Sequence, residues 1–136
     1  MILYQTNLKN ITSIKLADFF VRWPKPPSPE THLKILENSS HIVLAIDENI
    51  NQVIGFINAV SDKILSAYLP LLEVLPKYQK QGIGSELVKR MLDQLIDLYM
   101  IDLACDDNLV PFYNKLGMKK FRAMGIRNYD KQSGVV

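Results

Sequence analysis

One strand-to-helix junction, at residues 72–87, limits the fold of this chain more than any other segment. An apolar strand, a short polar loop and the start of an amphipathic helix follow one another there, with Gly82 and Gly84 at the junction. The first turn of a helix carries unpaired backbone N–H groups and the positive end of the helix dipole. Because glycine lacks a Cβ atom, a phosphate can approach this backbone closely. Lys77 and Lys80 add positive charge, so the junction predicts a cradle for a phosphate or pyrophosphate group.

The common phosphate-binding motifs differ from this junction in identifiable ways. A P-loop requires a Gly-Lys-Ser/Thr run, which the sequence lacks. A dinucleotide fingerprint requires G-x-G-x-x-G, and Leu87 stands where its third glycine belongs. Asp102 and Asp106 lie near the distance at which such a site needs an acidic residue, so the dinucleotide interpretation is weakened rather than eliminated. The pattern that remains is Q-x-x-G-x-G, complete from Gln79 to Gly84.

Two segments together resemble a known enzyme family. Residues 79–84, preceded by Leu-Glu-Val-Leu-Pro at 72–76, resemble the acyl-CoA-binding motif of the GNAT N-acetyltransferases. Residues 108–118 are similar to the second signature of that family, an Asn followed by Phe-Tyr-x-x-x-Gly-Met. Two motifs in the right order are far more specific than either alone. The resemblance extends over residues 42–121.

Bulk properties are those of a small soluble enzyme with one domain, which we place at residues 1–136. The hydrophobic fraction of 48% and the charged fraction of 22% are ordinary globular values. A net charge of +2, without a run of Lys or Arg, gives no reason to expect nucleic acid as a partner. The longest apolar stretches are far too short for a membrane span, so we expect no membrane association.

Cellular location follows from weaker signals. The first residues lack the charged and long apolar regions of a secretory signal. A single cysteine, Cys105, excludes an intramolecular disulfide, and we expect it to serve only packing. A cytoplasmic location is the default expectation.

Hydrophobic periodicity and turn residues predict the order of the elements. Apolar spacing predicts a helix at 11–22, which ends where four prolines fall within 24–29. Ser28 and Pro29 predict the start of a second helix, and the remaining elements follow from alternation and amphipathicity. The later elements are a helix at 29–38, a hairpin of 41–46 and 53–60, a strand at 65–75 broken by Pro70, a helix at 82–98, a strand at 100–105, a helix at 108–116, and one or two strands within 118–127.

This order predicts a mixed α/β fold with α+β character. The resemblance implies a single GNAT-type domain, whose central sheet is mixed, mostly antiparallel and flanked by about four helices. It also implies that the sheet is splayed at the bulged strand, where proline breaks the ladder.

The resemblance implies acetyl-CoA as a cosubstrate and no metal. The strand ending at Leu75 would pair with the pantetheine arm, and a backbone N–H of Leu72 or Val74 would polarise the thioester carbonyl. The 79–85 loop would hold the pyrophosphate. The expected acetyl-CoA-binding residues are Leu72, Val74, Leu75, Gln79, Lys80, Gln81, Gly82, Ile83, Gly84, Ser85, Asn108 and Phe112. Asn108 is also expected to cap its helix.

Two side chains are the candidates for proton transfer. The match to the Phe-Tyr signature gives Tyr113 the role of general acid toward the departing thiolate. Glu73, a carboxylate among leucines and a valine, is the first candidate for the base, acting directly or through a water chain. Glu73 pointing outward, or only binding the substrate cation, is the other interpretation. His41 is a second candidate for the base.

The acceptor is the part that the sequence defines least. The segment 23–29 could form a wall of its pocket, with Phe20, Trp23, Ser66 and Tyr68 as candidate lining residues, while the phenylalanines equally fit simple core packing. A small-molecule amine or a protein or peptide amine fits, and a homodimer is left open. Two alternatives to an enzyme remain: a non-catalytic acyl-CoA-binding regulatory or sensor protein, and a phosphate-binding protein for another ligand. Gln81, where many relatives carry Arg or Lys, removes one charge from the cradle.

Overall fold

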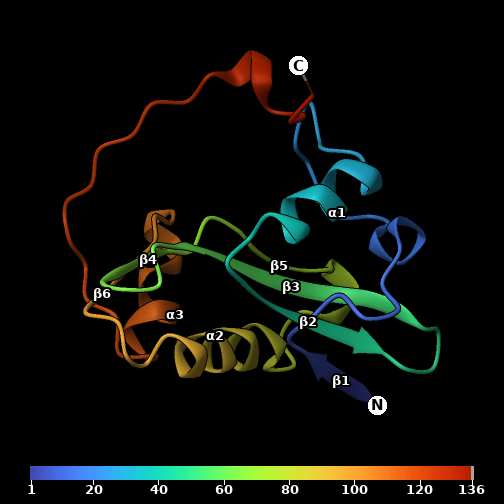
Figure 1. The fold of residues 1–136 in the computed structure, drawn as a ribbon, viewed down its shortest axis with the longest axis horizontal. Helices are drawn as coiled ribbons and strands as arrows, with labels where there is room; N and C mark the ends of the chain where they lie inside the picture. Colours follow the sequence, from blue (N-terminus) through green and yellow to red (C-terminus); the bar gives the residue numbers. More distant parts are fainter. Residues whose placement is uncertain (136) are drawn as a thin grey trace.

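A six-stranded sheet with apolar layers on both faces organises the chain. The computed structural model describes residues 1–135 (Figure 1). The strand order is β1-β2-β3-β4-β6, with β5 also paired to β3, and only the β4–β6 pair is parallel. The strands are β1 Ile2–Gln5, β2 His41–Asp47, β3 Gln52–Ser61, β4 Ser66–Tyr68, β5 Leu72–Val74 and β6 Met100–Asp102. This confirms the expected mixed, mostly antiparallel sheet.

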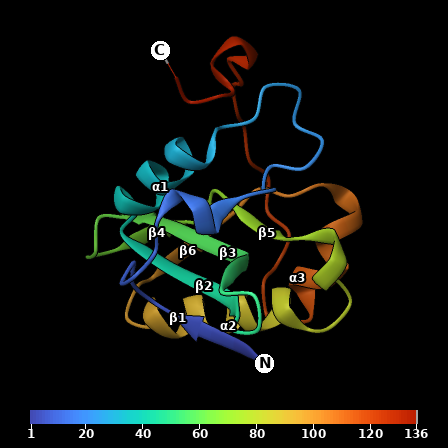
Figure 2. The same cartoon turned by 90° about the vertical axis from the view of Figure 1, so that its right-hand side faces the viewer.

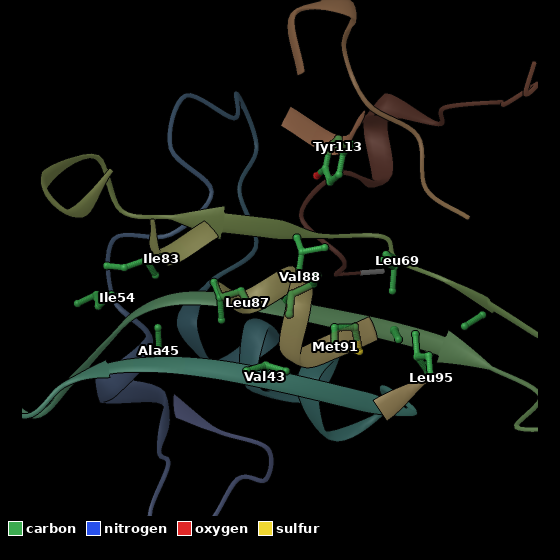
Figure 3. Packing of buried hydrophobic residues seen from close by; sticks show 13 residues of the cluster. Val43, Ala45, Ile54, Leu69, Ile83, Leu87, Val88, Met91, Leu95 and Tyr113 are labelled. Carbon is green, nitrogen blue, oxygen red and sulfur yellow. The ribbon is translucent and has the colours of Figure 1, made fainter. Parts of the chain in front are cut away.

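The two faces of the sheet are covered by different helices. In Figures 1 and 2, α1 (Pro29–Glu37) lies on one side of the sheet and α2 (Ile83–Gln94) on the other. The α2 face is packed by alternate strand residues and by the apolar stripe of the helix: Val43, Ala45, Ile54, Leu87, Val88, Met91 and Leu95 (Figure 3). Phe56, Leu36 and Leu44 are among the residues that pack the α1 face. Burial of such side chains at roughly 25 cal/mol per Å² holds both layers on the sheet.

Local signals set the ends of the two long helices. The Ser28 hydroxyl accepts the Thr31 N–H at 3.1 Å, and Pro29 occupies the first turn, as the sequence predicts for α1. Helix α2 begins after Gly82, whose φ of 83° only glycine adopts without strain. It ends at Gln94, four residues earlier than the periodicity indicates, because Leu95 already leaves helical geometry.

The third strand of the sequence is divided at the proline, as expected. Both β4 and β5 pair with β3, but residues 69–71 between them bulge out of the ladder. The carboxamide of buried Asn58 holds this bulge, since its Oδ1 accepts the Leu71 N–H at 3.0 Å. β6 pairs with β4 as far as the hydrogen bond from the Leu69 N–H to the Asp102 carbonyl. Beyond this hydrogen bond the two segments separate. This separation is the splay in the sheet.

The predicted helix at 11–22 is wrong. Only Ser13–Leu16 forms a short 3₁₀ turn, η1, and Asp18, Phe20 and Arg22 have positive φ. Alternating left-handed residues cannot continue a helix. The apolar spacing reflects burial of Phe20 and its neighbours against the sheet, in a loop and not in a helix. Three α-helices therefore accompany the sheet within residues 1–135, instead of about four.

The predicted strands within 118–127 are also absent from the described chain. After α3 (Val110–Asn114), residues 118–128 form no strand or helix, and a 3₁₀ turn, η4, follows at Tyr129–Lys131. β6 is shorter than expected as well, since it ends at Asp102 and leaves Cys105 exposed. No helix among residues 1–135 has the length and apolar character needed to cross a membrane.

Candidate functional site

The glycine loop leads into the start of α2 and leaves backbone donors of its first turn without an acceptor in the described chain. Lys80 and Gly82 both have positive φ, so the backbone turns sharply before the helix. The Glu86 N–H makes the first intrahelical bond, to the Gly82 carbonyl. Within residues 1–135, no protein acceptor reaches the backbone N–H groups of 83–85, which precede it in the first turn. Unpaired N–H groups and the positive end of a helix dipole suit an anion such as phosphate.

β5 pairs with β3 along one edge, and its other edge pairs with no strand of the described chain. The Leu75 N–H donates to the Ile54 carbonyl at 2.9 Å, and the Leu71 carbonyl accepts the Asn58 N–H at 3.2 Å. Backbone groups alternate in direction along a strand, so those of Leu72 and Val74 face away from β3. The Val74 carbonyl is engaged by Gln79 Nε2 at 2.9 Å, which ties the loop to the strand. The remaining groups on this edge suit an amide-containing ligand strand.

The splay between β5 and the segment after β6 contains a cavity of about 310 Å³. Leu72, Cys105 and Tyr113 are among its lining residues. Tyr113 is 9% exposed and lies at the margin of the core cluster, apart from the row of α2 side chains (Figure 3). Burial, and secondarily the neighbouring Cys105 thiol, raises the pKa of Tyr113 to about 12. The phenol is therefore protonated throughout the neutral range.

The two sequence motifs meet in space. A Cβ atom built on Gly84 would lie 3.6 Å from the ring of Phe112, so α3 packs directly against the first turn of α2. The Phe112 ring also packs edge-on against Tyr113, with centroids 4.9 Å apart. Asn108 is exposed within a 3₁₀ turn, η3, at Asp107–Leu109, and it makes no capping hydrogen bond. Its expected role as a helix N-cap is wrong, because α3 starts after Leu109.

Glu73 lies on the other face of β5, half-buried above Phe56. Its carboxylate accepts the Phe20 N–H at 2.8 Å and the Val21 N–H at 3.3 Å. Successive backbone N–H groups in a turn with positive φ form an anion-binding nest, and this carboxylate occupies it. Burial raises the pKa of Glu73, and the two backbone hydrogen bonds oppose that rise without cancelling it.

A second cavity, of about 410 Å³, opens beside Glu73. Phe20, Trp23 and Gln79 are among its lining residues. Trp23, Leu71 and Leu72 line this cavity and the splay cavity alike. The two cavities are therefore neighbours on either side of these residues, one lined by a carboxylate and the other by a phenol.

Three candidate residues lie outside both cavities. Ser66 is the first residue of β4, where its N–H donates to Asp62 Oδ1, and Tyr68 is 43% exposed at the end of the same strand. His41 stands at the start of β2, where burial and the Lys63 charge lower its pKa. None of them is brought together with Glu73 and Tyr113.

Sequence reasoning missed two residues that shape the site. Asn58 fixes the bulge, and its signal was a lone carboxamide within the apolar run of β3. Arg22 lines the Glu73 cavity from a loop that periodicity assigned to a helix. Among the described residues, no group of three or more His, Cys, Asp or Glu side chains is placed to hold a metal ion.

Comparisons with known proteins agree with this geometry. The profile of the Acetyltransferase (GNAT) family matches residues 8–118. The crystal structure of a Deinococcus radiodurans R1 protein, provisionally described as an acetyltransferase, has a TM-score of 0.96 at 50% identity, over 99% of this chain and 94% of that one. The GNAT family acetyltransferase SP0256 of Streptococcus pneumoniae TIGR4 has a TM-score of 0.70 at 29% identity, over 94% of this chain and 99% of that one. The uncharacterized N-acetyltransferase ycf52 of Pyropia yezoensis is 30% identical, over 87% of this chain and 71% of that protein.

Proposed function

The chain belongs to the acetyltransferase (GNAT) family, and we propose that it transfers an acetyl group from acetyl-CoA to a primary amine by direct attack within a ternary complex. The observation that carries this proposal is that Leu71 and Leu72 line both cavities, so the carboxylate cavity and the phenol cavity are neighbours. An amine beside Glu73 and a thioester beside Tyr113 would meet there without any covalent enzyme intermediate.

The donor is assigned to the splay side. The N–H groups of 83–85 and the Lys80 charge would hold the pyrophosphate, with Gln79, Gln81 and Gly82 shaping the loop. The free edge of β5, at Leu72 and Val74, would pair with the amides of the pantetheine arm. An N–H from the same edge would donate to the oxyanion that forms when the amine attacks the thioester carbon. The Phe112 ring packs beside Gly84 and would support the loop. Asn108 lies in η3, directly before α3.

Proton transfer is assigned to Tyr113 and Glu73. As the C–S bond breaks, Tyr113 donates its proton to the departing thiolate, giving free CoA. Burial raises the pKa of the phenol, and a CoA thiolate desolvated in the same cavity would accept a proton more readily than it does in water. Glu73 accepts the proton that the amine must lose, directly or through water, and its raised pKa brings it closer to the range of an effective base.

The acceptor is assigned to the Glu73 side, as a primary amine on a small molecule or a peptide. Phe20 and Trp23, whose ring centroids are 4.9 Å apart, give this cavity an aromatic wall. Glu73 at its inner end would attract an ammonium group before deprotonation.

A thiol-release assay with the full chain tests the proposal. Acetyl-CoA is supplied with a panel of a polyamine, an arylalkylamine, and peptides with free lysine or N-terminal amines, and free CoA is measured against an amine-free control. The proposal predicts release that depends on one or more amines, together with an acetylated product by mass spectrometry. A rise in melting temperature with acetyl-CoA but no amine-dependent release would instead support a regulatory binding protein. Absence of any acetyl-CoA binding would overturn the donor assignment.

A further inference from the structure

Residues 118–128, here called the arm, leave the body of the molecule after α3. Figure 1 shows the arm, in orange to red, curving away from the sheet before it returns near α1. Its apolar side chains face solvent: Phe121 is 76% exposed, Met124 is 102% exposed and Ile126 is 87% exposed. Such a series of exposed large side chains on one segment is unusual for a monomer and marks an interaction surface.

The backbone of the arm is also unpartnered. Within residues 1–135, no backbone hydrogen bond joins 119–127 to the rest of the chain. The polar contacts of this stretch are a long ion pair between Lys120 and Asp107, at 3.9 Å, and a bond within the arm from Arg127 to the Ile126 carbonyl. Extended backbone with free N–H and C=O groups is a template for strand pairing.

The far end of the arm is fastened to the opposite side of the molecule. The Lys25 N–H donates to Gln132 Oε1 at 2.8 Å, and Gly134 lies against the Thr31 side chain. With its ends held near α3 and near α1, the arm makes no backbone hydrogen bond to its own β6 in the described part of the chain. It therefore does not form the intramolecular strand that its sequence predicts.

The Deinococcus radiodurans crystal structure supports this course. The superposition of the two structures has a TM-score of 0.96 and covers 99% of this chain, so it includes the arm. A different path for residues 118–135 would have kept the score well below that value. The arm thus has one defined course in both chains, although little in the single copy holds it.

β6 offers a matching surface. It is the last strand of the sheet order, so its outer edge is open. The segment 96–110, which contains β6, has four exposed aspartates and no lysine or arginine: Asp97, Asp102, Asp106 and Asp107. The segment 118–128 has four basic residues and no acidic one: Lys119, Lys120, Arg122 and Arg127. Opposite charges of equal number favour pairing of these two segments.

We propose that two copies of this chain form a symmetric dimer in which the arm of each copy lies along the β6 edge of the other. Residues 119–127 then add a strand to the partner's sheet, and the exposed apolar side chains of the arm become covered. Basic residues of the arm meet the aspartates that flank the partner's β6. The proposal does not depend on the reaction that the enzyme catalyses.

Sedimentation velocity and hydrogen exchange on the full chain test this proposal. We expect a dimer at micromolar concentration, with the amides of 119–127 protected from exchange. The double variant Phe121→Glu/Ile126→Glu should weaken the dimer at least 100-fold and remove that protection. Ile14→Glu is the matched control, because Ile14 is 77% exposed on η1, away from β6. It should remain dimeric.

A charge-swap experiment distinguishes this dimer interface from any other. Arg122→Glu/Arg127→Glu and Asp97→Lys/Asp102→Lys should each weaken the dimer, and their combination should restore it. Misfolding cannot explain such a rescue. A monomeric native chain would overturn the proposal, whether the arm is protected or not. A dimer with unprotected 119–127 amides, or one that the arm variants leave intact, would overturn it as well.

Discussion

The carboxylate of Glu73 accepts the backbone N–H of Phe20 at 2.8 Å, across 53 positions of the sequence. This bond, with a second from Val21, fixes both the direction of the carboxylate and the path of the loop. A charged group and an aromatic wall of the same cavity are thereby positioned by one interaction. The loop that replaces the expected helix is thus part of the candidate acceptor site.

Glu73→Gln should lower kcat/KM roughly 100-fold for the best amine, within the range for loss of a general base. The amide oxygen can still accept the Phe20 N–H, so the fold should persist. Because burial raises the pKa of Glu73, the acidic limb of the native pH profile should lie above the ordinary glutamate value of 4.5 and vanish in the variant. Glu37→Gln, on the exposed end of α1, is the control. An unchanged kcat/KM for Glu73→Gln would remove Glu73 as the base.

Tyr113→Phe should lower kcat roughly 100-fold while the dissociation constant for acetyl-CoA stays within about twofold, because only the proton donor is lost. Since the pKa of Tyr113 is about 12, the native enzyme should show no alkaline limb from this phenol below about pH 11. Stopped-flow binding and steady-state rates measure the two quantities. Tyr99→Phe, at an 83% exposed position, controls for loss of a hydroxyl. Equal kcat in Tyr113→Phe and the native chain would contradict its role as the acid.

Local patterns predicted the elements whose stability is local or strongly periodic. Ser28 and Pro29 located the start of α1, the apolar stripe located α2, and Pro70 located the break between β4 and β5. Each depends on backbone sterics or on amphipathic burial, which neighbouring residues determine. The two motif segments were also identified, and the structure packs Gly84 against Phe112.

Long-range interactions decided the rest, and no local pattern contains them. The helix expected at 11–22 gives way to a loop that Glu73 organises through Phe20. The bulge depends on Asn58, thirteen positions away from Leu71. Ser66 was expected to line the acceptor pocket, but it begins β4, beside Asp62 and outside both cavities. The strand expected within 118–127 lacks a partner inside one copy, and β pairing requires one.

Gly82→Ala and Gly84→Ala should separate backbone strain from ligand access. Gly82 has a φ of 83°, so alanine there should reduce the free energy of unfolding by about 1 kcal/mol. Gly84 has no such φ, and its new Cβ would meet Phe112 at an ordinary 3.6 Å, so stability should change little. Its acetyl-CoA affinity should nevertheless fall, because the methyl group would stand between Val74 and Phe112 in the first turn of α2, where we place the pyrophosphate.

Urea unfolding and isothermal titration measure these two effects. Each variant is the control for the other. If Gly84→Ala binds acetyl-CoA as tightly as the native chain, the first turn of α2 is not the pyrophosphate site.

His32 should make the protein less stable in mild acid. Its side chain is 1% exposed among aromatic rings, and neither ring nitrogen has a hydrogen-bond partner. Burial lowers the pKa of His32 from 6.5 to about 4. Between these values the unfolded chain binds more protons than the folded one, so the free energy of unfolding falls as the pH drops from 6.5 toward 4. The loss attributable to His32 reaches about 3 kcal/mol below pH 4, and it is absent well above pH 6.5.

His32→Leu should remove this part of the pH dependence, because leucine packs against the same rings and carries no titrating group. Urea unfolding at intervals from pH 4 to pH 7 gives the slope for each variant. His41→Gln is the control, since that half-buried histidine on β2 lies outside the aromatic cluster and its replacement should retain the His32 contribution. His32→Leu shares every other titrating group with the native chain, so the difference between those two slopes isolates His32. Equal slopes in His32→Leu and the native chain would mean that the pKa of His32 is the same in the folded and the unfolded chain, which would contradict the prediction.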